Sequence, residues 1–167
     1  MSNGKNPNSF LIAIRRVKVI AFSVNENLFI QNPEKEIKIE IQQEQSFNLD
    51  NKWIFQNIRC YFHYEETPDQ YLVDIKVQNV FEMPEIKEFL IEGNILKLSF
   101  EVLVTILSMS IGHTRALLAD RSAGTIYQHI LLPVVNAIDL AKQLFPGAEP
   151  SDIVKEDLKK LQERVEK

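Results

Sequence analysis

The strongest constraint on the fold is a long apolar stretch within residues 95–145. Residues 102–112 contain no formal charge, so this part of the chain must be buried. On a helix, its apolar side chains would form two stripes, and each stripe needs a cover. The stripes comprise Leu96, Phe100, Leu103, Leu107, Ile111 and Leu118 in one and Leu98, Val102, Ile106 and Met109 in the other. We expect the chain's own sheet to supply one cover and a second subunit to supply the other. The residues predicted to contribute to that subunit interface are Leu103, Leu107, Ile111 and Arg115.

The start of this helix is ambiguous. Residues 95–104 alternate between apolar and polar side chains, so they also fit a strand. We therefore expect the helix to begin somewhere between Asn94 and Val104, and to end at Ala123 and Gly124. The uncharged part falls well short of the roughly 20 residues that a membrane-spanning helix needs, so we expect no membrane insertion.

A second, shorter helix is predicted after the long one. Pro133 occupies the position of a first helical residue, where the missing backbone N–H has no intrahelical partner to lose. The residues that follow it at helical spacing are Val134, Ile138, Ala141 and Phe145. Pro146 and Gly147 are expected to end this helix.

The segment before the long helix is predicted to form four strands, because apolar and polar side chains alternate along it. The strands are expected over residues 10–22, 37–49, 54–64 and 71–81. We expect a bulge at Arg15 and Arg16 and a loop over residues 25–33. Short turns favour an antiparallel meander with one polar side. The predicted fold class is therefore α+β, with a four-stranded antiparallel sheet followed by a crossover and two helices on one face.

The composition indicates one globular domain, predicted over residues 10–147. Residues 1–9 are polar and rich in Asn and are expected to be a disordered leader. They do not have the charged-then-apolar layout of a signal peptide. Residues 148–167 are rich in charge and are expected to form a helical tail. A single cysteine, Cys60, excludes an internal disulfide. Together these features predict a cytoplasmic protein.

Neither nucleic-acid binding nor catalysis is indicated by the charged and polar residues. The formal net charge is −4, with acidic and basic side chains interspersed, so we expect no nucleic-acid partner. His63, His113 and His129 are not at metal-ligand spacing, and His63 is expected on a solvated polar face. Cys60 alternates with apolar residues, as an inert core thiol does. Phosphate loops and nucleophile motifs are absent, so we predict no enzyme, no metal and no cofactor.

Five short motifs follow one another in the chain. They are Ala21-Phe22 before an Asn-rich loop, Leu72-Val73-Asp74-Ile75, His113-Thr114-Arg115, Gly124-Thr125 and Leu132-Pro133-Val134. With the predicted order of strands and helices, they resemble the SecB family of export chaperones over residues 17–145. The corresponding family motifs are a Ser-Phe-Glu-Ala-Pro-Asn stretch, Leu-Cys-Glu-Val, Tyr-Ala-Arg on the long helix, and the Gly-Thr-Phe-Pro and Pro-Val-Asn loop.

The resemblance implies a homodimer or homotetramer that holds unfolded or presecretory polypeptides without ATP, in apolar grooves between the sheet and the helices. It also implies docking to the translocation motor ATPase for protein export. Val19 and Ser23 stand where the family has carboxylates, so Asp74 is the candidate docking residue. The candidate client-binding residues are Phe81, Phe89, Ile126, Tyr127, Ile130 and Leu131.

Three other interpretations stay open. The first is a chaperone dedicated to one partner, such as an antitoxin, which would explain the missing docking carboxylates. The second is a small-ligand enzyme that resembles the hot-dog fold of thioesterases, with His113 and Asp120 as acid–base candidates. The third is an oligomeric structural domain whose apolar surfaces are all buried by assembly.

Overall fold

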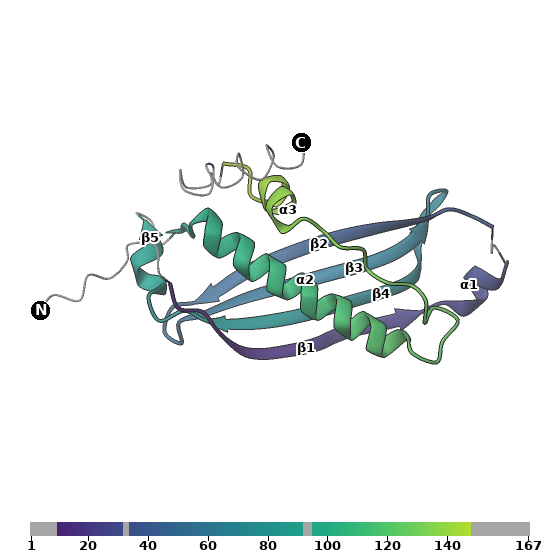
Figure 1. Cartoon of the computed structure of the whole chain (residues 1–167), viewed down its shortest axis with the longest axis horizontal. Helices are drawn as coiled ribbons and strands as arrows, with labels where there is room; N and C mark the ends of the chain where they lie inside the picture. The colour runs from purple at the N-terminus through teal and green to yellow at the C-terminus, as the bar shows by residue number, and fades with distance from the viewer. Residues whose placement is uncertain (1–9, 32–33, 92–94, 148–167) are drawn as a thin grey trace, which may run out of the picture.

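The computed structural model describes residues 10–31, 34–91 and 95–147. It has two layers, and Figure 1 shows the long helix α2 running across one face of a sheet of long strands. The predicted leader, residues 1–9, and the predicted charged tail, residues 148–167, lie outside the described residues.

Four antiparallel strands form the sheet, as predicted. They are β1 (Ala13–Val24), β2 (Ile37–Asn48), β3 (Trp53–Tyr64) and β4 (Thr67–Glu82). Their order is β1-β4-β3-β2, so β2, β3 and β4 form a meander while β1 lies beside β4. The prediction of a four-strand meander is therefore wrong in the placement of β1. This order is a Greek key, because the connection from β1 to β2 passes over β4 and β3.

The predicted loop between the first two strands contains a short helix, α1 (Glu26–Gln31). The Asn25 side-chain oxygen accepts a hydrogen bond from the backbone N–H of Leu28 at 3.2 Å, which favours a helical turn over an open loop. The predicted bulge in β1 is confirmed by a register shift between Ile14 and Arg16. By contrast, β2 pairs with β3 without a register shift over its whole length.

The crossover after β4 contains a 3-10 helix, η1 (Ile86–Phe89), and a small hairpin of β5 (Leu90–Ile91) and β6 (Ile95–Leu96). Helix α2 (Phe100–Ser122) then begins after Ser99, whose hydroxyl accepts from the Val102 backbone N–H at 3.4 Å. This N-cap resolves the ambiguity between strand and helix: the first residues of the alternating stretch form β6, and the helix starts at residue 100. The helix ends at Ala123 as predicted, and Gly124 takes the left-handed conformation, with φ of 79°.

Both apolar stripes of α2 are covered within the single chain. One set of its residues packs with β3 and β4 in one cluster, and another set packs with the crossover in a second cluster. The buried apolar residues of the helix are Phe100, Val102, Leu103, Ile106, Leu107, Ile111 and Leu118. The second subunit is thus not needed to bury these stripes. By length and composition α2 could cross a membrane, but the core helix of a soluble protein meets the same criterion.

Hydrogen-bonded polar side chains lie in the core between the two apolar clusters. Gln56 on β3 and Asn79 on β4 are 1% and 0% exposed. Each lies on the same face of its strand as the apolar residues that face α2. His113 of α2 donates from Nδ1 to Asn79 Oδ1 at 2.7 Å, and Asn79 Nδ2 donates to the Gln56 carbonyl at 3.4 Å. Because an unpaired buried polar group is costly, this network favours one position of α2 on the sheet.

The second helix is shorter than predicted. Helix α3 (Ala137–Leu144) begins after Asn136, whose side-chain oxygen accepts from the Ile138 backbone N–H at 3.0 Å. Pro133 was expected as the first helical residue, but it lies in an extended segment before the helix. A capping Asn is a stronger helix start than a proline that can only be tolerated there.

The loop after α2 is anchored by a buried tyrosine. Tyr127 is 0% exposed, and its hydroxyl donates to the backbone oxygen of Asn25 at 2.5 Å. Its ring meets the ring of Phe29 edge to face, with 5.6 Å between the centroids. Burial raises the pKa of the Tyr127 hydroxyl to about 12. The loop is therefore fixed to α1 and to the end of β1.

The first prediction concerns the contact between helix and sheet. Ile106→Ala removes a fully buried side chain of α2 and should lower the free energy of unfolding by about 2–5 kcal/mol in urea titrations. Ser108 lies on the exposed side of the same helix, so Ser108→Ala should change the free energy of unfolding by less than about 0.5 kcal/mol. Equal effects of the two changes would contradict the packing of α2 described above.

The second prediction concerns pH. Tyrosine in an unfolded chain ionises near pH 10, whereas the pKa of Tyr127 is about 12 in the folded protein. The stabilisation from its buried O–H is therefore present below pH 10 and is lost as pH rises towards 12. The wild type should exceed Tyr127→Phe in unfolding free energy by about 1 kcal/mol at pH 8. That difference should shrink between pH 10 and 12; a constant difference would show that Tyr127 is not buried.

Candidate functional site

Among the residues that the structure describes, the helical layer covers β2 only in part on the face that carries α2. Helix α2 contacts β1, β3 and β4, and α3 contacts α2. Two of the β2 side chains that face this layer are exposed: Ile39 is 39% and Phe47 is 40% exposed. The residues between them on this face, Ile41, Gln43 and Gln45, are half-buried. This open face of β2 forms one side of the candidate site.

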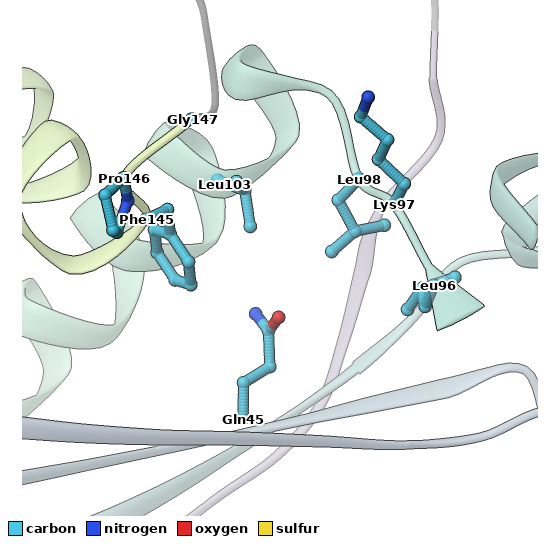
Figure 2. Close-up of a pocket in the computed structure, with 8 residues that line it drawn as sticks. All are labelled: Gln45, Leu96, Lys97, Leu98, Leu103, Phe145, Pro146 and Gly147. Carbon is cyan, nitrogen blue, oxygen red and sulfur yellow. The ribbon is translucent and has the colours of Figure 1, made fainter. Parts of the chain in front are cut away.

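A pocket of about 290 Å³ opens beside this face of β2. Figure 2 shows Gln45 rising from the strand, with Phe145 on one side and Leu96 and Leu98 on the other. The lining residues are Gln45, Leu96, Lys97, Leu98, Leu103, Phe145, Pro146 and Gly147. This volume lies just below the range for ligand pockets, about 300–1,000 Å³. We call this pocket, together with the exposed face of β2, the β2 groove.

The β2 groove has apolar walls and few polar groups. Its walls come from the crossover, from the first turn of α2 and from the end of α3, which are brought together only by the fold. The polar side chains in the pocket are the Gln45 amide at the floor and Lys97, which Figure 2 shows pointing away from the centre. None of the lining residues is a carboxylate, a histidine or a cysteine. The site is therefore suited to binding apolar side chains rather than to acid–base or nucleophilic chemistry.

The predicted client-binding residues do not line the pocket. Phe81 and Tyr127 are 0% exposed and belong to the core, so their assignment to a groove is corrected. Phe89 and Ile130 are half-buried. Ile126 and Leu131 are exposed on the segment after α2 and stay candidates for client contact. These residues were chosen as apolar residues of the inter-helix loop and of the region near the crossover, and apolar character does not distinguish a covered side chain from an open one.

The predicted interface residues also have partners within the chain. Leu103, Leu107 and Ile111 are buried in the two core clusters, so they are not available to a second subunit. Arg115 donates from Nε to the Leu132 carbonyl at 3.0 Å, and from Nη2 to the next carbonyl at 2.7 Å. It therefore ties the extended segment before α3 to α2. The exposed side of α2 consists of small or polar residues, Ser108, Gly112, Ala116 and Asp120.

The candidate docking carboxylate, Asp74, is neutralised by a neighbour on the outer face of the sheet. Arg59 donates from Nε and Nη2 to the two Asp74 oxygens at 3.0 and 2.7 Å. The guanidinium also lies about 5 Å from the ring centroids of Tyr61 and Tyr71. The hydrogen bonds to Asp74 raise the pKa of Arg59, so the pair keeps its charges but presents little net charge. An acidic docking surface therefore does not form around Asp74.

The histidines do not form a catalytic arrangement. His63 is buried, not solvated as predicted, with Nδ1 at 2.9 Å from the Tyr64 carbonyl and Nε2 at 3.2 Å from Glu40. His113 hydrogen-bonds Asn79, as described above, and lies seven residues before Asp120 on one helix, about 10 Å along its axis. The acid–base pair required by the thioesterase-like interpretation is therefore not formed.

The one cysteine is a core residue, as predicted. Cys60 is fully buried on β3, and burial raises the pKa of its thiol to about 12. The nucleophilic thiolate is therefore not populated near neutral pH. Within residues 10–31, 34–91 and 95–147, no three His, Cys, Asp or Glu side chains gather as metal ligands would.

Sequence analysis did not identify the residues of the β2 groove. The available signal was a break in the apolar pattern of β2. Ile37, Ile39, Ile41 and Phe47 face the helical layer, but Gln43 and Gln45 occupy the same face between them. Polar residues at core-facing positions indicate either a buried network or an open site. Here both are present, because Gln45 lies at the floor of the pocket and hydrogen-bonds the buried Gln56.

The sequence matches no protein-family model and no curated protein. The fold does match a solved structure, described as Mycobacterium tuberculosis Rv1957 SecB-like chaperone in complex with a ChAD peptide from Rv1956 HigA1 antitoxin. The TM-score is 0.50 and the identity is 14%, over 75% of this chain and 88% of that chain. The four-stranded antiparallel sheet with its helices on one face is therefore a SecB-like α+β fold.

Proposed function

We propose that this protein is an ATP-independent chaperone that binds segments of unfolded polypeptide in the β2 groove. The observation that carries the proposal is the open pocket, lined mostly by apolar side chains, beside a partly covered edge strand of a SecB-like fold. A chaperone that binds the unfolded client and not the native client slows the folding and aggregation of that client by mass action, without nucleotide hydrolysis. No catalytic group is needed for this activity, and we propose that the protein is not an enzyme.

Weak apolar subsites give useful affinity when several are linked. We propose that the protein acts as a homodimer or homotetramer in the cytoplasm, with several β2 grooves available to one client. The surfaces that support assembly are the outer edge of β1, which pairs with no other strand among the described residues, and the exposed small residues Ser108, Gly112 and Ala116 of α2. Small side chains allow two helices to approach closely.

Two kinds of client fit the β2 groove. One is the general set of unfolded or presecretory polypeptides, delivered to the export motor. The other is a single dedicated partner, such as an antitoxin. The neutralised Asp74 favours the second, because no acidic docking surface for the motor forms around it. The solved structure with this fold holds a peptide from an antitoxin, which supports a polypeptide client of this kind.

The test is aggregation of a slowly refolding model protein, followed by light scattering without ATP, on a sample whose mass has been fixed by sedimentation. Suppression at near-stoichiometric amounts is expected for a general chaperone. A dedicated chaperone would leave scattering unchanged but bind peptides from its own partner. Binding of neither model protein nor any peptide would contradict the proposed function.

The third prediction concerns the exposed face of β2. Phe47→Ser removes an exposed phenyl ring from the β2 groove and should weaken binding of an unfolded, fluorescent peptide by about 5- to 30-fold, equivalent to about 1–2 kcal/mol. The measurement is fluorescence anisotropy on samples of unchanged mass. Ile30→Ser is the control, because Ile30 is exposed on α1, at the other end of the sheet in Figure 1. Equal losses in both variants would place the binding site elsewhere.

A further inference from the structure

Three glutamines form a connected row of side-chain amides from the core to the β2 groove. Gln56 lies on β3, and its buried amide uses both of its polar atoms. Gln56 Nε2 donates to Gln43 Oε1 at 2.9 Å, and Gln56 Oε1 accepts from Gln45 Nε2 at 3.0 Å. The backbone oxygen of Gln56 also accepts from Asn79, which holds β3 to β4 and α2. The row is thus fixed to the core at one end.

The other end of the row leaves one donor and one acceptor without a partner. Gln43 Nε2 and Gln45 Oε1 hydrogen-bond no other residue in the part of the chain that the structure describes. Figure 2 shows the Gln45 amide directed into the pocket. Gln43 and Gln45 are two residues apart on the same face of β2, so their backbones are separated by about 6.6–6.8 Å.

A free amide donor beside a free amide acceptor is complementary to the main chain of an extended polypeptide. The edge of an extended chain presents both N–H and C=O groups. We propose that the two glutamines bind the client main chain, with Gln43 Nε2 donating to a client carbonyl and Gln45 Oε1 accepting from a client N–H. This inference rests on the proposed function. It states what the β2 groove recognises in a client: an extended backbone next to an apolar side chain.

The physical reason is desolvation. A client segment that enters an apolar pocket loses water from its backbone amides, and an unmade hydrogen bond there would offset much of the gain from its apolar side chain. Polar atoms at the floor of the β2 groove replace that water. Every residue except proline carries the same N–H and C=O groups, so recognition of the main chain does not restrict the client sequence. The walls formed by Leu98, Leu103 and Phe145 then select a large apolar side chain.

Gln56 is a positioning residue in this scheme, because it does not reach the client itself. Its amide offers one donor atom and one acceptor atom to these two neighbours, so the atoms left available on Gln43 and Gln45 are of opposite kind. Without Gln56 both amides could rotate, and the pairing of donor and acceptor would be lost. The glutamines therefore have a shared role that a single exposed glutamine on a strand would not have.

The test uses a labelled apolar peptide in which each amide N–H is replaced in turn by an ester oxygen. With the wild-type protein, one position should lose binding by about 3- to 10-fold in fluorescence anisotropy, because the ester cannot donate to Gln45. Gln45→Met keeps the length of the side chain but cannot accept that hydrogen bond. This fourth prediction is that Gln45→Met binds the all-amide peptide more weakly, by a similar factor, and is insensitive to the ester at that position.

The control is Gln42→Met, because Gln42 lies on the opposite face of the same strand and hydrogen-bonds Tyr61 there. It should retain both the affinity and the ester effect of the wild type. A flat ester scan in the wild type, with tight binding of every peptide, would overturn the role of the glutamines and leave the proposed function intact. Failure of the wild type to bind any peptide would overturn both. The scan on the wild type needs no variant, so a misfolded Gln45→Met would not prevent the test.

Discussion

The burial of α2 against the sheet is the interaction on which the rest of the structure depends. Both of its apolar stripes are covered, one mainly by β3 and β4 and the other mainly by the crossover. Each large apolar side chain that is fully buried contributes about 1.5–3 kcal/mol, so this contact outweighs any single polar interaction on the surface. The hydrogen bond between His113 and Asn79 favours one position of the helix on the sheet, because only that position gives both side chains their partner.

The position of α2 also creates the β2 groove. A helix that contacts β1, β3 and β4 leaves the edge strand β2 only partly covered by the residues that the structure describes. The crossover, the start of α2 and the end of α3 then form walls around one part of β2. Core and binding site are therefore two results of one packing arrangement. The polar row from Asn79 through Gln56 to Gln45 connects them.

The sequence predicted which residues face the same side of each element but not what covers that side. Cys60 was correctly placed in the core because its neighbours on β3 are apolar. Phe81 and Tyr127 were expected in a groove and Leu103, Leu107 and Ile111 at a subunit interface, but these residues are buried within the chain. His63 was expected in solvent, yet it is buried against Glu40 of the neighbouring strand. Periodicity is a local property, whereas cover depends on residues far along the chain.

The sequence by itself determined the main elements of secondary structure: four alternating strands, a bulge at Arg15, and a long helix that ends just before Gly124. These features follow from side-chain alternation and backbone preferences within a few residues. Only the tertiary structure decided the placement of β1 beside β4, the pairing of Arg59 with Asp74, and the pocket between Gln45 and Phe145. Each of these joins residues that are distant in sequence, and their pairing depends on the free energy of the whole packed arrangement rather than on any local pattern.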